Sequence, residues 1–130
     1  MKKALLFGIV LLTLLSGCWQ KSIGLSYYPS GKIRSEATVK NNVLDGLATS
    51  YFESGVKMSE ATYLSGTLHG QAFSYYENGS KKSAAQYKNG VLHGTSASWS
   101  ENGALVDEVS FIDGRLIPKD TSGSSSANAK

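Results

Sequence analysis

The sequence predicts an all-β protein, an elongated single-layer antiparallel β-meander built from about four 24-residue repeats. Three observations support this fold class. An aromatic residue followed four positions later by glycine recurs at a fixed interval, short glycine-containing turns separate the segments between, and apolar and polar residues alternate within each segment. A fixed period of this length is the signature of a repeat architecture, and alternation with period two is typical of β-strands.

The repeat is continuous and needs no gaps. Its clearest copies are Tyr27–Gly31, Tyr51–Gly55, Tyr75–Gly79 and Trp99–Gly103, each beginning 24 residues after the one before. The same interval separates the turns that follow Val39, Tyr63, Tyr87 and Phe111, and it separates the members of a serine column, Ser26, Ser50, Ser74 and Ser98. Agreement in so many columns indicates one structural unit repeated four times.

Two turns in each unit divide it into strands. Pairs such as Ser65-Gly66 and Asn89-Gly90 are two-residue hairpin turns, which require positive φ. The other turn, Glu-Ser-Gly or Glu-Asn-Gly, also ends in a glycine suited to that conformation. These turns leave strands of about 7 to 10 residues, one set beginning near residues 33, 57, 81 and 105. Helix is disfavoured because no apolar stripe with a period near 3.6 extends past the turns.

Alternation assigns the side chains to two faces. In the strands beginning near residue 33 and its equivalents, one face carries Ala37, Val39, Ala61, Tyr63, Ala85, Tyr87, Val109 and Phe111, and the other carries charges such as Arg34, Glu36, Glu60, Lys82 and Glu108. In the intervening strands Tyr27, Tyr51, Tyr75 and Trp99 form an aromatic column that repeats about every 10 Å. The aromatic residues either stack as the core of the sheet or remain partly open to a partner. The candidate partner-binding residues are Tyr51, Phe52, Tyr63, Tyr75, Tyr76 and Tyr87.

The first 17 residues have the order of a signal peptide, with Lys2 and Lys3 before an apolar run over residues 4–15. This run is too short to span a bilayer, which takes about 20 residues. Leu15-Ser16-Gly17-Cys18 resembles the bacterial lipobox, so Cys18, the only cysteine, is expected to carry the lipid anchor. The resemblance implies a cell-envelope location. Trp19, in place of aspartate after the lipidated cysteine, favours the outer membrane if the source is Gram-negative.

We therefore expect residues 1–17 to be the lipoprotein signal peptide, 18–22 the lipidated N-terminus and linker, 23–117 the repeat domain, and 118–130 a disordered tail rich in serine and glycine. Without residues 1–17 the formal charge falls from +3 to +1, because two lysines are lost. This small charge gives no reason to expect a nucleic-acid partner.

Tyr63-x-x-Gly66-x-x-His69-Gly70 and its equivalent beginning at Tyr87 resemble the MORN repeat in its shorter bacterial variant, often described as a YwqK-type antitoxin. The resemblance covers about 90 residues, from Tyr27 to Leu116. The outer units depart from the motif, as capping units do. The resemblance implies a β-meander that serves as a binding surface, with links to membrane lipid and protein attachment in eukaryotic relatives.

No catalytic residues, metal ligands or cofactor site are expected. His69 and His93 fall in one column about 10 Å apart, too far to bind one metal ion directly, and we expect them to pack or hydrogen-bond beside the turns. The sequence therefore predicts a non-catalytic, membrane-anchored binding protein for a protein, glycan or lipid at the cell envelope. The alternative is an immunity or antitoxin protein that neutralises one toxin.

Overall fold

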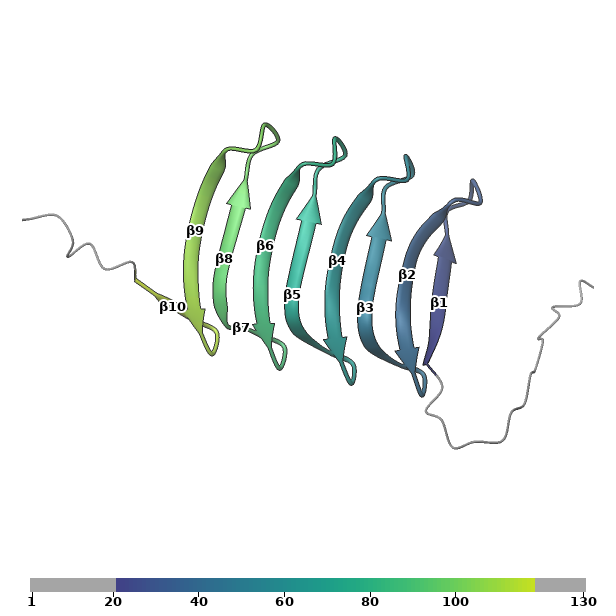
Figure 1. Ribbon diagram of the computed structural model, residues 1–130, viewed down its shortest axis with the longest axis horizontal. Coiled ribbons are helices and arrows are strands. Elements are labelled where there is room, and N and C mark those ends of the chain that lie inside the picture. Colours follow the sequence, from purple (N-terminus) through teal and green to yellow (C-terminus); the bar gives the residue numbers. More distant parts are fainter. Residues whose placement is uncertain (1–20, 119–130) are drawn as a thin grey trace, which may run out of the picture.

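The computed structural model describes residues 21–118, which form a single antiparallel sheet (Figure 1). The predictions for residues 1–17, for Cys18 and for most of the 118–130 tail lie outside the described residues. The strands are β1 (Lys21–Tyr27), β2 (Ile33–Lys40), β3 (Val43–Tyr51), β4 (Lys57–Leu64), β5 (Thr67–Tyr75), β6 (Lys81–Lys88), β7 (Val91–Leu92), β8 (Gly94–Trp99), β9 (Leu105–Ile112) and β10 (Arg115–Ile117). No helix long and apolar enough to cross a membrane is found over this range.

The strands lie side by side in sequence order, β1-β2-β3-β4-β5-β6-β8-β9-β10, with β7 also paired to β6. The predicted meander is therefore confirmed, and the strands predicted near residues 33, 57, 81 and 105 begin at those positions. β1 begins at Lys21, so the sheet starts two residues before the boundary predicted at residue 23. Figure 1 shows one curved layer with the two kinds of turn at opposite margins.

The turns have the predicted backbone geometry. Ser65 and Gly66 have φ values of 48° and 82°, and Asn89 and Gly90 have 50° and 82°. Two consecutive positive φ angles define the hairpin turn whose twist matches that of the flanking strands. The first unit forms the same turn with Asn41 and Asn42, at 51° and 61°. Asparagine tolerates this conformation better than most residues, which explains a turn without glycine.

Each long hairpin also contains a bulge, where the register shifts between Ala37 and Val39 and again between Ala61 and Tyr63. Gly46 lies opposite the first of these shifts with a φ of 130°. A Cβ atom at Gly46 would come within 2.9 Å of the Cβ of Thr38. Both the backbone conformation and the close contact therefore require glycine at this point.

The sheet formed by residues 21–118 has no enclosed core of its own. Among the described residues only Ala97 and Thr49 are buried, and no large side chain is fully buried. Side chains are instead shielded by their neighbours along the sheet, so Tyr51 and Tyr75 are only partly buried. Stability must come from cross-strand pairs and backbone ladders, which are the main stabilising contacts of a sheet. In the part of the chain that the structure describes, no second layer covers either face.

Candidate functional site: the two faces of the sheet

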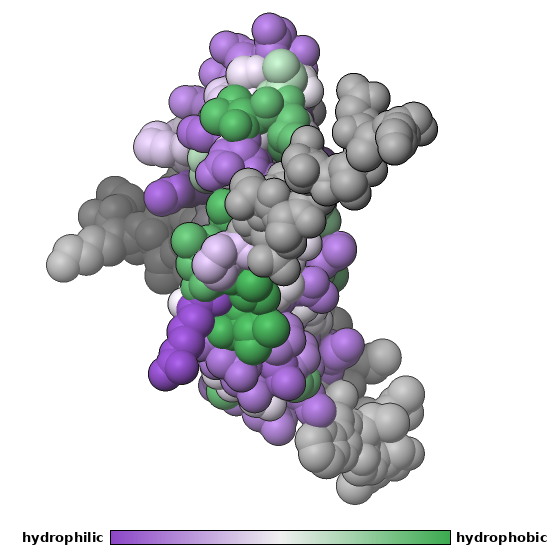
Figure 2. Space-filling model, turned by 90° about the vertical axis from the view of Figure 1, so that its left-hand side faces the viewer, coloured by the Kyte–Doolittle hydropathy of each residue, from purple (hydrophilic) through white to green (hydrophobic). Residues whose placement is uncertain are grey.

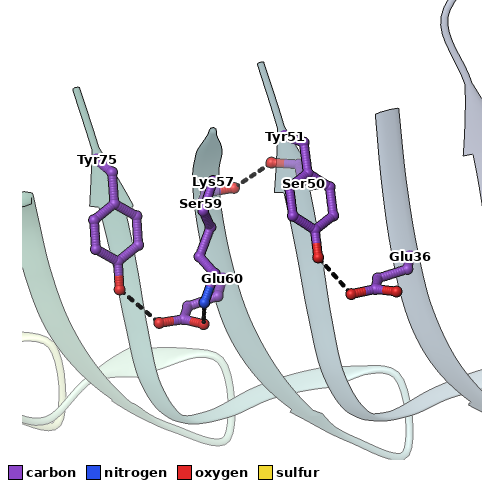
Figure 3. Close-up of polar contacts among 7 residues, drawn as sticks. All are labelled: Glu36, Ser50, Tyr51, Lys57, Ser59, Glu60 and Tyr75. Atoms are coloured by element: carbon purple, nitrogen blue, oxygen red, sulfur yellow. Dashed lines mark hydrogen bonds and ion pairs between the residues drawn. The ribbon is translucent and has the colours of Figure 1, made fainter. Parts of the chain in front are cut away.

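One face, here called the tyrosine–glutamate face, carries a repeated polar pair. The phenol of Tyr51 donates a hydrogen bond of 2.5 Å to Glu36, and that of Tyr75 donates one of 2.6 Å to Glu60. Lys57 adds an ion pair to Glu60, with 2.7 Å between Nζ and Oε2. Each tyrosine reaches to the adjacent strand, where the carboxylate belongs to a residue 15 positions earlier in the chain (Figure 3). The repeat thus places the same pair at the same point of two successive units.

These pairs perturb the ionisation of their members. Burial, followed by the hydrogen bond to Glu60, raises the pKa of Tyr75 to about 12. The hydrogen bond to Glu36, followed by burial, raises the pKa of Tyr51. The hydrogen bond from Lys57, followed by that from Tyr75, lowers the pKa of Glu60. Each shift favours the form that makes the bond, a neutral phenol beside an ionised carboxylate. The tyrosine–glutamate pairs therefore stabilise the folded sheet.

The next position along the sheet breaks this pattern on both strands at once. Trp99 replaces the tyrosine, and Ala84, 15 residues earlier, replaces the glutamate. A hollow of about 250 Å³ forms here, lined by Phe73, Trp99 and Ala84 among others. The ammonium of Lys81 lies 5.1 Å from the ring centre of Phe73 and 5.4 Å from that of Trp99. At this position cation–π attraction therefore replaces the phenol–carboxylate bond.

The opposite face, here called the serine–alanine face, is formed by small residues. In the first three units, serine hydroxyls on adjacent strands form hydrogen bonds with an oxygen–oxygen distance of 2.6 Å. The pairs are Ser26–Ser35, Ser50–Ser59 and Ser74–Ser83. The alanines form the next column, with Ala37, Ala48, Ala61, Ala72 and Ala85 all in register. The small side chains leave a hollow of about 340 Å³, which Leu44 and Tyr63 help to line.

Tyr63 and Tyr87 lie along one border of the serine–alanine face. Their register partners Leu68 and Leu92 lie beside them. Neither phenol makes a hydrogen bond within residues 21–118, unlike those of Tyr51 and Tyr75. Their hydroxyl groups are therefore available to a ligand.

Phe52 and Tyr76 lie at the turn margin, one residue past the ends of β3 and β5. Tyr76 donates to the backbone carbonyl of Trp99 at 3.0 Å, as Tyr28 in the first unit does to Tyr51 at 2.7 Å. Each of these bonds joins one turn to the strand end of the next unit. Phe52 occupies the same column but lacks the hydroxyl.

The structure therefore distributes the six candidate aromatic residues over three places and does not gather them in one surface. Two lie on the tyrosine–glutamate face, two border the serine–alanine face, and two lie at the turn margin. Sequence reasoning missed the hollow around Trp99. The available signal was Ala84, which interrupts a glutamate column otherwise filled by Glu36, Glu60 and Glu108.

The two histidines contact the hairpin turns, as predicted. Nδ1 of His69 lies 3.5 Å from the backbone N–H donor of Asn89, and Nδ1 of His93 lies 3.4 Å from that of Asp113. The Asp113 carboxylate is also 3.2 Å from Nδ1 of His93. Asp45 takes the same position in the first unit and accepts from the backbone of Ser65. This column therefore fastens each hairpin turn to the preceding unit.

Three segments of the chain match the family described as the MORN repeat variant, namely residues 23–41, 44–64 and 68–89. This chain carries MORN repeats. The structure extends the MORN pattern beyond the matched segments, because β8 and β9 pair through Ser98 and Asp107 where the earlier units pair two serines. Searches among curated proteins and among solved structures gave no match.

Proposed function

We propose that the chain is a bacterial membrane-anchored lipoprotein, cleaved after residue 17 and lipidated at Cys18, whose MORN repeat sheet binds a protein partner at the cell envelope without catalysis. The observation that supports binding most directly is that residues 21–118 form a sheet with no enclosed core and no second layer on either face. MORN repeats suggest a binding repeat protein. Trp19, in place of aspartate, supports the outer membrane as the location in a Gram-negative cell.

The serine–alanine face is the better candidate surface. Its hollow of about 340 Å³ is lined by small side chains and bordered by Tyr63. Aromatic side chains with a free polar end are common anchors of protein interfaces. Tyr63 and Tyr87 fit this description, whereas the phenols of Tyr51 and Tyr75 already bond within the sheet. We therefore assign partner contact first to Tyr63 and Tyr87.

The binding test compares residues 19–130 with the double variant Tyr63→Ser/Tyr87→Ser in pull-downs from envelope extract. The matched control is Thr62→Ser/Gln86→Ser, which changes the neighbouring positions on the opposite face. Loss of one captured protein in the tyrosine variant alone, at an unchanged melting temperature, supports the assignment. Equal capture by all three proteins refutes it. A single captured protein that is toxic without this chain would favour the immunity role.

The anchor has its own test. Cys18→Ser should abolish incorporation of labelled palmitate and leave uncleaved or mislocalised precursor. A labelled Cys18→Ser protein would refute lipidation at this residue.

A further inference from the structure

Both ends of the sheet present an open edge. The outer side of β1 has no partner strand among the described residues. At the other end β10 covers only Ser110–Ile112 of β9, which leaves Leu105–Val109 open. An open edge carries unpaired backbone N–H and C=O groups and is a template for a strand from another chain.

Both edges also expose large apolar side chains. Ile23 on β1 is 69% exposed and Val106 on β9 is 67% exposed, the two highest values among the exposed large hydrophobic residues. Figure 2 looks onto the end of the sheet formed by β9 and β10 and shows hydrophobic residues gathered among hydrophilic ones. Leu105, Leu116 and Ile117 contribute to this exposed apolar set. Association of the two ends would remove such groups from water.

The tyrosine–glutamate pairs supply a more specific argument. Both pairs join a glutamate to a tyrosine 15 residues later, and the next position in the series lacks both, with Ala84 and Trp99 in their places. By this rule one tyrosine and one glutamate are left over. They are Tyr27 on β1 and Glu108 on β9, and neither side chain makes a hydrogen bond within residues 21–118.

The chain itself cannot complete either pair. The residue 15 positions before Tyr27 is Leu12, and the residue 15 positions after Glu108 is Gly123. Neither has a side chain that could form the bond. The unmatched donor at one end and the unmatched acceptor at the other are therefore complementary only between two copies.

We propose that β1 of one copy pairs with the open edge of β9 in a second copy, in the register of the repeat. Ser50, Ser74 and Ser98 lie opposite residues 35, 59 and 83 of the strand before. Continued across copies, this register sets Ser26 of one copy opposite Asp107 of the other. The Tyr27 phenol then donates to Glu108, as Tyr51 does to Glu36.

The geometry at β10 allows this addition. Strand β6 pairs with β7 near the hairpin turn and with β8 further along its length. Strand β9 likewise pairs with β10 near its hairpin turn, but within residues 21–118 no strand occupies the position equivalent to β8. Ser22–Tyr27 is equivalent by repeat to Gly94–Trp99, the residues of β8. Such a contact joins unlike ends, so it continues from copy to copy as one extended sheet.

Association through the two edges requires no other protein. The test is sedimentation of residues 19–130, which include the whole sheet, over a range of concentrations. In this register Leu25 lies opposite Glu108, as Thr49 lies opposite Glu36. Leu25→Glu therefore places like charges across the contact, and Glu108→Lys removes the acceptor of the Tyr27 phenol. Each variant alone should be monomeric, and an equimolar mixture should associate, because the introduced glutamate of one protein then lies opposite the introduced lysine of the other.

Two further variants test the bond itself. Tyr27→Phe removes only the donor and should weaken self-association on the order of tenfold, as expected for a hydrogen bond to a charged acceptor. Tyr63→Phe also removes a hydroxyl that has no hydrogen bond within residues 21–118, but Tyr63 lies on the interior strand β4. This variant should leave association unchanged. In the full-length chain in cells, Leu25→Cys and Glu108→Cys on separate copies should crosslink.

Specific results overturn the proposal. A wild-type protein that stays monomeric at the highest soluble concentration refutes it, and so does association that both Leu25→Glu and Glu108→Lys retain. If removal of residues 119–130 is needed before association appears, those residues cover the β9 edge and a second copy does not.

Discussion

The phenol of Tyr75 offers the most direct measure of what holds this sheet together. Tyr75→Phe keeps the ring and removes only the 2.6 Å hydrogen bond to Glu60. A hydrogen bond to a charged group contributes about 1.5–3 kcal/mol, and partial exposure favours the lower end of this range. Glu60 keeps its ion pair with Lys57, so the carboxylate is not left without a partner. We expect a loss of about 1.5 kcal/mol in the free energy of unfolding.

The assay is urea unfolding of residues 19–130, followed by circular dichroism. For a domain of this size each kcal/mol shifts the melting temperature by roughly 4–8 °C, so the variant should melt roughly 6–12 °C lower. Tyr63→Phe is the matched control, because its phenol has no hydrogen bond within residues 21–118, and it should lose less than about 0.5 kcal/mol. Equal losses in the two variants would refute the assignment of stability to this bond.

Three further predictions concern pH and individual columns. Because the folded state raises the pKa of Tyr75 to about 12 from 10.0, its contribution should be complete below pH 10 and lost as pH rises to about 12. Unfolding free energy measured against pH should fall in this window, and Tyr75→Phe should flatten the fall. Phe52→Tyr should add about 0.5–1.5 kcal/mol by supplying the turn-to-carbonyl bond that the first and third units have; a lower denaturation midpoint would contradict this. Gly46→Ala should destabilise the sheet by about 1–3 kcal/mol more than Gly55→Ala, since both have positive φ but only the first places a Cβ against Thr38. Equal denaturation midpoints for these two variants would show that the contact with Thr38 does not destabilise the Gly46→Ala variant.

The features that were predictable from sequence are those set by local chemistry. Turn pairs such as Ser65-Gly66 require a particular backbone conformation wherever they occur, so they fixed the strand ends and the period. Strand alternation then gave the faces of residues such as Ala61 and Glu60 correctly. The repeat made each of these inferences available four times, which is why the meander could be recognised without any tertiary information.

The distribution of the aromatic residues was harder to predict, because it depends on bulges. A bulge adds residues to one strand, so positions that are close in sequence change their relation to the sheet. The register shift between Ser50 and Tyr51 directs Tyr51 and its neighbour Phe52 to different surroundings. The bond partners of the phenols were likewise hidden, since each carboxylate lies 15 residues away on another strand. Spacing alone did not indicate which tyrosines would form hydrogen bonds within the sheet.

The column of Asp45, His69 and His93 joins each unit to the next. Between Lys21 and Ile117 no strand lies beside one that is distant in sequence. Every contact thus closes a short loop of chain, and short loops cost little entropy to form. Such a protein can change length by whole units. Deleting residues 52–75 would join Tyr51 to Tyr76 in the same register and shorten the sheet by about 10 Å. The number of units is therefore a dimension that evolution can alter without redesigning any one contact.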